Sequence, residues 1–500
     1  MINHQTLRLR RLGIDTYTDP VIFMNRDCPI FRSEGFEARA RVKVALDRRQ
    51  IIATLHVVSE TLLAVDEGGL SEFAWRALGA TEGAQVRVSH PEPVESVSRL
   101  RAKVYGARLD AADMQAIIRD VAAGLYSDLQ LAAFVTATAG DRLDEAETIA
   151  LTQAMLGAGE RIRWDFPVVA DKHSVGGLPG NRTTPLAVAM VAACGVPIPK
   201  TSSRAITSPA GTADTMEVLA PVDLDVPAMR RVVEKEGGCV VWGGAVRLSP
   251  ADDVLIRVER PLDFDSEGQL VASVLSKKAA AGSTHVVIDM PVGPTAKVRS
   301  AQAAASLSGR LRAAGATLGL QLRIEQTDGS QPVGRGIGPA LEARDVLAVL
   351  QSKGPPDLRE RAVRLAGAVL ELAGAAAAGR GEAMAGAALA DGRAWRKFQA
   401  ICAAQGGMRE PPRSSISHVV EAQASATVAG FDNRRLARLA KLAGAPSDKA
   451  AGLDLHVRIG DRVERGQPLF TVHAEAPGEL AYALEYLARQ TGIVVLEAAE

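Results

Sequence analysis

The sequence predicts a multidomain α/β protein, in which a helical domain joins a domain built on a mainly parallel sheet and a small β-rich domain lies at each end. Two observations lead to this fold class. Apolar residues recur at helical spacing over Asp110–Ala123 and Asp144–Leu156, a pattern typical of amphipathic helices. After Phe166, patterns of strand, Gly-rich loop and helix alternate, which favours a parallel sheet covered by helices.

Domain boundaries follow from these changes of pattern. Short β-type runs at Ala38–Val44 and Ile51–Val58 precede a Pro-containing break at His90–Pro93. Near the other end, Gly452–Phe470 alternates with period two and resembles the small barrel-like modules of biotinyl and lipoyl domains, without their modifiable lysine context. We therefore expect four domains, over residues 1–90, 98–163 with part of 250–285, 164–425 and 430–500.

The balance of charge argues against a nucleic-acid partner. Lys+Arg and Asp+Glu both number 58, and no basic stripe stands out. The four cysteines lie far apart and the eight histidines lack metal-ligand spacing, so we expect neither a metal nor another cofactor. The N-terminus lacks the apolar region of a signal peptide, and apolar stretches stay well short of ~20 residues. We therefore expect a cytoplasmic protein with no membrane partner.

The most informative stretch is Asp171–Pro185, DKHSVGGLPGNRTTP, between a strand predicted at Pro167–Ala170 and a helix. Its glycines, Gly176 among them, let backbone N–H groups approach a ligand closely. The helix N-terminus contributes about half a positive charge, while Lys172 adds a cation and Ser174 a hydroxyl. These features predict a phosphate site, and an ordinary strand-to-helix turn is the alternative.

A second stretch of the same kind is Lys200–Thr212, KTSSRAITSPAGT. Ser208 can cap a helix with Pro209 at its first position, as Thr183 or Thr184 can cap the first helix. A solvated loop could have the same composition. Two hydroxyl-rich helix starts so close in sequence could instead meet one ligand from two sides.

Three motifs resemble those of thymidine and pyrimidine nucleoside phosphorylases. DKHSVGG at Asp171–Gly177 is similar to the phosphate-loop signature of that family. LVASVLSKK at Leu270–Lys278 resembles its segment with a base-contacting Ser and Lys, and Thr327–Glu342 resembles its later Gly-rich loop. With the C-terminal barrel, the resemblance covers roughly residues 98–500. It implies the nucleoside phosphorylase/phosphoribosyltransferase fold and a homodimer or higher homo-oligomer.

A finer resemblance is to AMP phosphorylases. They share PGNRTT at Pro179–Thr184, the run KTSSRAITSPAGTADTMEV at Lys200–Val218, and a domain before the helical one. Narrow thymidine phosphorylases instead have a Gly-Asp turn after the first loop and a GHTGGT-like second loop. Both features are missing here, at Pro179–Asn181 and Thr207–Thr212.

The resemblance implies roles for individual positions. Lys172 and Ser174 would hold the attacking phosphate, and His173 would assist at the reaction centre. Asp265 matches the proton donor of AMP phosphorylases, and Lys277 matches the base-contacting lysine of the thymidine enzymes. The remaining positions that match phosphate or substrate contacts are Gly176, Gly177, Ser203, Arg204, Ala205, Ile206, Thr207, Ser208, Thr212, Ser273 and Lys297.

These residue types suit phosphorolysis, in which phosphate adds to the anomeric carbon while the base leaves. Fixed N–H and hydroxyl donors orient the phosphate, and an acid can protonate the leaving base. Asp265 could be that acid if its surroundings raise its pKa. From the residues alone, Asp263–Glu267 could be only an acidic helix start, His173 could be structural, and Lys277-Lys278 could be an exposed helix face.

We therefore expect an enzyme that uses inorganic phosphate to cleave a nucleoside 5′-monophosphate such as AMP into free base and ribose 1,5-bisphosphate. The alternative is a thymidine or pyrimidine nucleoside phosphorylase, which gives thymine and 2-deoxyribose 1-phosphate. A phosphoribosyltransferase is disfavoured because the chain shows no acidic motif for pyrophosphate and Mg²⁺. A binding protein without catalysis would not need an acid beside a phosphate loop.

Overall fold

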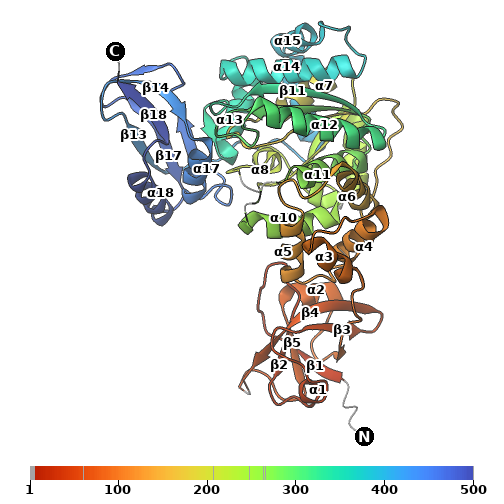
Figure 1. Ribbon diagram of the computed structural model, residues 1–500. Coiled ribbons are helices and arrows are strands. Elements are labelled where there is room, and N and C mark those ends of the chain that lie inside the picture. Colours follow the sequence, from red (N-terminus) through yellow and green to blue (C-terminus); the bar gives the residue numbers. More distant parts are fainter. Residues whose placement is uncertain are drawn as a thin grey trace. The chain divides into compact units, whose positions relative to one another are not determined.

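The computed structural model describes residues 6–59, 61–205, 208–246, 248–262, 264 and 266–498. Over this part the chain divides into two compact units. One consists of residues up to Ala102 together with Asp120–Ala133, and the other of Lys103–Arg119 together with the residues from Phe134 onward. The four domain boundaries expected from the sequence stay a prediction. Figure 1 labels the elements of both units.

Six strands of the first unit close into a β-barrel, in the order β1-β5-β2-β4-β3-β6. Val42 and Val44 are fully buried while their neighbours in the strand are partly exposed. Every second side chain of the strand therefore points into the barrel and helps to fill it. The predicted β-type runs correspond to β3 and β4. The bounds are β1 Thr6–Arg11, β2 Val21–Asn25, β3 Arg41–Leu46, β4 Arg49–Val58, β5 Glu67–Leu70 and β6 Gln85–Ser89, with α1 Pro29–Ser33 and α2 Glu72–Leu78.

Four helices follow the barrel, and two begin at the predicted caps. Asp144 accepts a hydrogen bond from the backbone N–H of Glu147, whose side chain in turn accepts from the backbone N–H of Asp144; this is a capping box. Asp110 accepts likewise from the N–H of Asp113 at 2.8 Å. The bounds are α3 Ser96–Val104, α4 Ala111–Ala122, α5 Asp128–Ala137 and α6 Glu145–Gly157. Throughout the described residues, every helix is too short or too polar to span a membrane.

A three-stranded parallel sheet, in the order β11-β10-β7, lies in the second unit. Its strands are β7 Ala170–Ser174, β10 His285–Val292 and β11 Gln321–Asp328, and a separate parallel pair is formed by β8 Ile198–Ser202 and β9 Gly238–Trp242. The strand predicted at Pro167–Ala170 is therefore placed too early. Asp171–Ser174 belongs to the strand because it pairs in register with β10.

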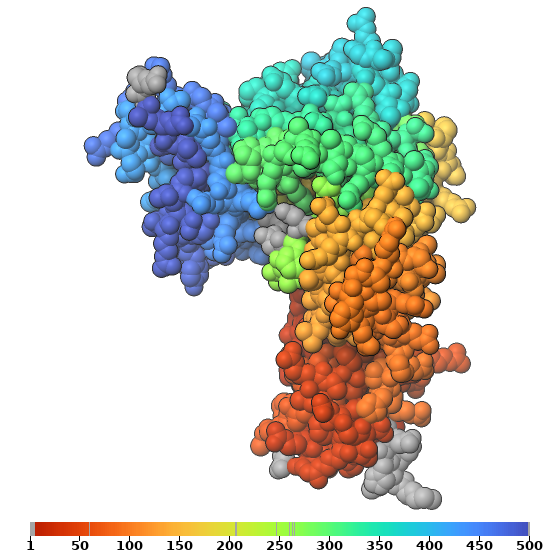
Figure 2. Space-filling model, in the orientation of Figure 1, coloured from red at the N-terminus to blue at the C-terminus, as the bar shows by residue number. Residues whose placement is uncertain are grey.

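Successive residues of this sheet face two different cores. Val287 packs with residues of α7 and α14, whereas Val286 and Ile288 pack with residues of α11 and α12. Lys172 pairs with Val287 and so shares its face, while Asp171 and His173 point to the other. Figure 2 shows the side chains of α12, in green, over one side of this region.

Helices surround these strands, and together they confirm the predicted mainly parallel α/β architecture. Those in the described part of the chain are α7 Thr183–Ala193, α8 Thr212–Glu217, α9 Val226–Glu236, the 3₁₀ turn Gly243–Val246, α10 Pro250–Leu262, α11 Glu267–Ala280, α12 Ala301–Thr317, α13 Pro339–Leu350, α14 Pro356–Leu372, α15 Gly381–Ala390 and α16 Arg393–Ala404.

The C-terminal part contains two small sheets rather than one closed barrel. Their orders are β12-β15-β17-β13 and β16-β14-β18. Gly336 and Ile337 of β12 pair with Asp454 and Leu453 of β15, which attaches the later Gly-rich segment to this part. The bounds are β12 Gly336–Ile337, β13 Ile416–Glu421, β14 Ala426–Phe431, α17 Asn433–Leu442, β15 Gly452–Leu455, β16 Arg462–Val463, β17 Pro468–Ala474, α18 Pro477–Arg489 and β18 Val494–Ala498.

Candidate active site

The first loop connects the end of β7, at Ser174, to the start of α7. Gly176 and Gly177 adopt φ angles of +87° and +81°, a region that favours glycine. A Cβ on Gly177 would lie only 2.4 Å from the backbone nitrogen of Lys297, so this position must stay without a side chain. Arg182 occupies the N-cap position of α7. The expectation that Thr183 or Thr184 caps this helix is therefore wrong, because both lie within its first turn.

Lys172, a predicted phosphate contact, is fully buried under the first loop. Its Nζ donates to Thr183 Oγ1 at 2.7 Å and lies 3.6 Å from Asp289 Oδ2. Burial lowers the pKa of Lys172 to about 8, although the Asp289 carboxylate opposes this shift. The ammonium is therefore charged at neutral pH and places a positive charge beside the first residue of α7. Its contact with phosphate stays a prediction.

Asp289 is the centre of this buried network. Its carboxylate accepts from Asn181 Nδ2 at 2.9 Å and from Thr327 Oγ1 at 2.7 Å, and the same Asn181 nitrogen lies 3.4 Å from Ser174 Oγ. Burial alone would raise the pKa of Asp289, but Lys172 and these hydrogen bonds lower it. Asp289 was not singled out from the sequence. The one available signal is a carboxylate inside an otherwise apolar strand.

The opposite face of β7 carries a second buried charge cluster. Asp171 accepts from Lys278 Nζ at 2.8 Å and from Ser283 Oγ at 3.1 Å, and Lys200 Nζ lies 3.7 Å away. Burial would raise the pKa of Asp171, but the two lysines lower it. His173 lies on the same face, where burial and the lysines lower its pKa well below the usual value. His173 is therefore neutral at neutral pH.

The helix that follows the second loop begins later in the sequence than expected. Gly211 is the N-cap of α8, so the prediction that Ser208 caps a helix is wrong. Ser208 Oγ instead donates to a carbonyl within its own loop at 2.8 Å. Asp214 accepts from the backbone N–H groups of Gly211 and Ala205 at 2.9 and 2.6 Å. These two amides are thus already bound by a carboxylate of the protein, and ligand binding by the hydroxyls of this loop stays a prediction.

Arg204 of the second loop is also balanced by the protein's own acids. Two of its nitrogens donate to the two carboxylate oxygens of Glu217, each at 2.8 Å, and its guanidinium lies 4.8 Å from the centre of the Trp242 ring. The hydrogen bond with Arg204 is the main cause that lowers the pKa of Glu217 to about 2, and Lys449 adds to it. Ser203, next to this pair, is exposed.

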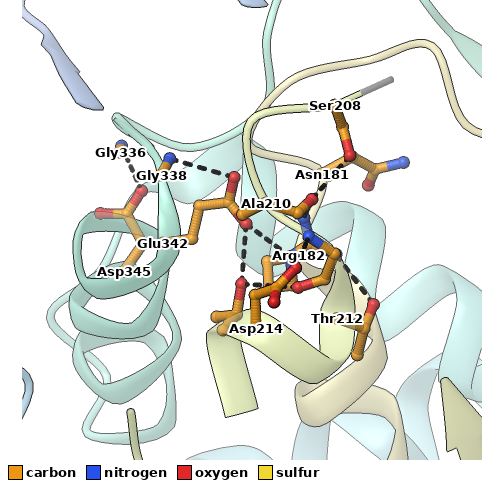
Figure 3. A network of polar contacts seen from close by, with 12 residues as sticks. Asn181, Arg182, Ser208, Ala210, Thr212, Asp214, Gly336, Gly338, Glu342 and Asp345 are labelled. Atoms are coloured by element: carbon orange, nitrogen blue, oxygen red, sulfur yellow. Dashed lines mark hydrogen bonds and ion pairs between the residues drawn. The ribbon is translucent and has the colours of Figure 1, made fainter. Parts of the chain in front are cut away.

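Arg182 links the first loop to the second (Figure 3). Its Nη1 donates to Thr212 Oγ1 at 2.8 Å and its Nη2 to the Ala210 carbonyl at 2.9 Å. Its Nε donates to Glu342 Oε2 at 2.6 Å. The side chains of Arg182 and Glu342 are 11% and 1% exposed, so this ion pair is shielded from water.

Glu342 extends the connection to two further elements. The same oxygen, Oε2, accepts from Thr215 Oγ1 at 3.0 Å, and Oε1 accepts from the backbone N–H of Gly338 at 3.3 Å. We call this set the three-loop network, because it joins the first loop, the second loop and the Gly-rich segment before α13. It consists of Arg182, Ala210, Thr212, Thr215, Gly338 and Glu342. Neither Arg182 nor Glu342 was assigned a role from the sequence.

The remaining predicted contacts lie on or near α11. Ser273 and Lys277 are one turn apart and partly exposed, and Lys277 Nζ forms an ion pair with Asp252 Oδ2 at 2.6 Å. The carboxyl group of Glu259, in α10, is a further acid that was not singled out from the sequence. Burial and the charge of Asp252 raise the pKa of Glu259 to about 7, with Lys297 and Lys277 opposing the shift.

The structure therefore brings several predicted residues together. A hydrogen bond joins Arg182 at the first loop to Thr212. Gly177 passes so close to the backbone of Lys297 that a Cβ there would clash, and the charge of Lys277 contributes to the lowered pKa of His173. Three predicted residues, Asp265, Ile206 and Thr207, lie outside the described residues.

Comparisons with known families match three consecutive segments. The "Glycosyl transferase family, helical bundle domain" matches residues 97–159, and the "Glycosyl transferase family, a/b domain" matches residues 167–395. The "Pyrimidine nucleoside phosphorylase C-terminal domain" matches residues 427–494. The two loops and the three-loop network all lie within the second of these segments.

A solved structure shares the fold of the central part. The crystal structure of anthranilate phosphoribosyltransferase from Thermus thermophilus superposes with a TM-score of 0.52 at 20% identity, over 61% of this chain and 98% of the other. At this identity the match concerns the fold alone.

Similar sequences extend over almost the whole chain. A protein of Polaromonas sp. (strain JS666 / ATCC BAA-500) named "Putative thymidine phosphorylase" is 69% identical over 98% of this chain and 97% of its own length. Proteins with the same name from Chelativorans sp. (strain BNC1) and Legionella pneumophila (strain Corby) are 60% and 56% identical, over 99% and 98% of this chain and 97% and 95% of their own lengths. The chain therefore belongs to the thymidine phosphorylase family of pentosyltransferases.

Proposed function

We propose that the protein cleaves an N-glycosidic bond by phosphorolysis and prefers nucleoside 5′-monophosphates, releasing the base and ribose 1,5-bisphosphate. The observation that carries the phosphorolytic part is the first loop. Its left-handed glycines lead into an eleven-residue helix, and the buried, charged Lys172 donates to Thr183, the first residue of that helix, at 2.7 Å. Backbone N–H groups, a helix N-terminus and a fixed cation in one place form an environment that suits a phosphate ion.

The chemistry requires a nucleophile and an acid. A phosphate oxygen bonds to C1′ while the C1′–N bond breaks, and the electron pair of that bond goes to the base, which takes up a proton. In our proposal the first loop, with Ser174, orients the phosphate, and Lys172 supports its charge from below. Asp265 donates the proton. Neutral His173, beside the loop, can accept or donate a hydrogen bond without adding charge.

The preference for a nucleotide is supported by the connection between the two loops. Thr212 is held by Arg182 from the first loop. The exposed Ser203 lies near it, because the Ser203 carbonyl accepts from the N–H of Ala213 at 3.2 Å. These hydroxyls can bind a 5′-phosphate while the first loop binds the attacking phosphate. Ser273, Lys277 and Lys297 would then contact the rest of the nucleotide. The base and the oligomeric state, which we expect to be a homodimer or larger, are not specified by these contacts.

A thymidine or pyrimidine nucleoside phosphorylase is the second candidate. It is favoured by the names of the three relatives and by the matched C-terminal domain of pyrimidine nucleoside phosphorylases. Such an enzyme would have no 5′-phosphate to bind at the second loop.

A substrate panel separates the two candidates. We would measure base release from AMP, CMP, UMP, adenosine, uridine and thymidine at one fixed phosphate concentration. The proposal expects at least one monophosphate to have a kcat/KM roughly tenfold or more above its nucleoside, since each lost polar contact costs about that factor. A higher kcat/KM for thymidine or uridine than for every monophosphate would establish the second candidate instead.

A further inference from the structure

We propose that Arg182 is a positioning residue for the 5′-phosphate of the substrate, because it fixes the hydroxyl of Thr212 as a hydrogen-bond donor. The inference rests on the proposed nucleotide preference. Arg182 would act through Thr212 rather than contact the substrate itself. The second loop could then still select an anion, although its own arginine, Arg204, is already paired with acids.

The chemistry of Arg182 decides whether the Thr212 hydroxyl donates or accepts in their hydrogen bond. A guanidinium carries only donors, so in the 2.8 Å contact Thr212 Oγ1 must be the acceptor. The hydroxyl hydrogen of Thr212 is then left to donate elsewhere. A phosphate offers only acceptors, whereas the 5′-hydroxyl of a nucleoside can donate or accept. A hydroxyl preset as a donor therefore favours the phosphorylated substrate.

The position of Arg182 is fixed on every side. Its three nitrogens each bind a different partner, namely Glu342, Thr212 and the Ala210 carbonyl (Figure 3). Glu342 in turn binds Thr215, which lies one helical turn after Thr212 in α8. Thr212 is thus held directly through its oxygen and indirectly through its own helix. A lysine at position 182 could not reproduce this fork of contacts.

The contrast with Arg204 supports the assignment. Arg204 donates to carboxylate oxygens of Glu217 and Asp214. Carboxylates are acceptors only, so they cannot in turn donate a hydrogen bond to a ligand. Of these two arginines, Arg182 is the one that donates to a hydroxyl within the described part of the second loop. That hydroxyl can in turn donate its own hydrogen to a ligand.

A double-mutant cycle tests this relay. The full-length protein carries Arg182→Met, Thr212→Val or both, and kcat/KM is measured with AMP and with adenosine at fixed phosphate. Each single substitution should lower the AMP value roughly tenfold while adenosine changes by less than about threefold. If Arg182 acts through Thr212, the double variant should also lose about tenfold rather than about a hundredfold. The control is Arg323→Met, which removes another Arg–Glu contact, Arg323 with Glu371 at 2.8 Å, and should leave both values unchanged.

Each result has a definite meaning. Additive losses in the double variant, or equal losses with AMP and adenosine, would overturn the relay. Should Arg182→Met fail to fold, Arg182→Lys in the same cycle with Thr212→Val keeps the test intact, because the lysine retains the charge but not the fork. Thr212→Ser, which keeps the hydroxyl, should restore most of the AMP activity. If the unmodified protein prefers adenosine to AMP, the proposed function is wrong and the relay is wrong with it. If the unmodified protein prefers AMP but the variants do not behave as described, only the relay is wrong.

Discussion

The two loops that follow β7 and β8 use their charged residues in opposite ways. At the first loop, the cations Lys172, in β7, and Arg182, at the N-cap of α7, bind hydroxyls as well as carboxylates: Thr183 and Asp289 for one, Thr212 and Glu342 for the other. In the second loop, Arg204 and the backbone N–H groups of Ala205 and Gly211 are bound by Glu217 and Asp214.

The difference bears on our proposal for which phosphate binds at which loop. Carboxylates that occupy the donors of the second loop leave it close to neutral, so it can contribute hydroxyls but little net charge. At the first loop, Lys172 is also paired with a carboxylate, that of Asp289, but the left-handed glycines and the N-terminus of α7 add backbone N–H groups. This comparison supports our proposal that the attacking phosphate binds at the first loop and that a substrate phosphate, held mainly by hydroxyls, binds at the second.

The largest expected effect comes from removing Asp171, which holds the base of the first loop in place. Asp171→Ala would leave the buried ammonium of Lys278 without its carboxylate and would remove the carboxylate that lies 3.7 Å from the Lys200 ammonium. The loss of one partner from a buried ion pair costs about 3–5 kcal/mol, and urea unfolding would measure it. Glu485→Ala, which breaks an exposed pair with Arg489, should cost less than about 1 kcal/mol. Equal losses in the two variants would show that the buried cluster does not support the loop.

The next effect separates the two loops by function. Lys172→Ala should weaken the use of phosphate by ~1.5–3 kcal/mol, the value of a charge-assisted hydrogen bond, which corresponds to roughly 10–150-fold in kcat/KM for phosphate. The KM for the nucleotide should change much less. Steady-state kinetics with each substrate varied in turn would measure both. An unchanged phosphate dependence would remove Lys172 from the phosphate site.

A smaller effect concerns the pH dependence of the first loop. Burial lowers the pKa of Lys172 to about 8, and the charge of Asp289 keeps it from falling further. The kcat/KM for phosphate should therefore fall as the pH rises through this value and the ammonium loses its proton. Asp289→Asn removes the charge that favours the protonated form, which lowers the pKa further. The fall should then begin about one unit lower in pH.

The control for this shift is the phosphate itself, whose own titration is the same for both proteins. The amide oxygen introduced at position 289 can still accept from Asn181, and the Thr327 hydroxyl can rotate to accept from the new amide nitrogen, so a folded variant is expected. An alkaline limb at the same pH in both proteins would mean that Asp289 does not act on Lys172, or that another group controls this limb.

Sequence reasoning located both loops but not the groups that hold them. DKHSVGG and KTSSRAITS are continuous, so their residue types are visible along the chain. Asp289 and Glu342 reach the loops from 108 and 160 residues away, and their distance in sequence hides the pairing. The misplaced helix starts have a local cause: Arg182 and Gly211 take the N-cap positions, because the nearby hydroxyls bind other partners. Asp214, which fills the amides of the second loop, lies only three residues beyond Gly211 and could have been noticed.

The most direct test of the central claim is whether inorganic phosphate is the group that attacks C1′. The purified protein would be incubated with AMP and ¹⁸O-labelled phosphate, and then without phosphate, and the sugar product would be analysed by mass spectrometry. We predict base release only with phosphate, and a ribose 1,5-bisphosphate whose phosphate at C1 carries the label. Base release without phosphate, or a sugar with no new phosphate at C1, would contradict the account.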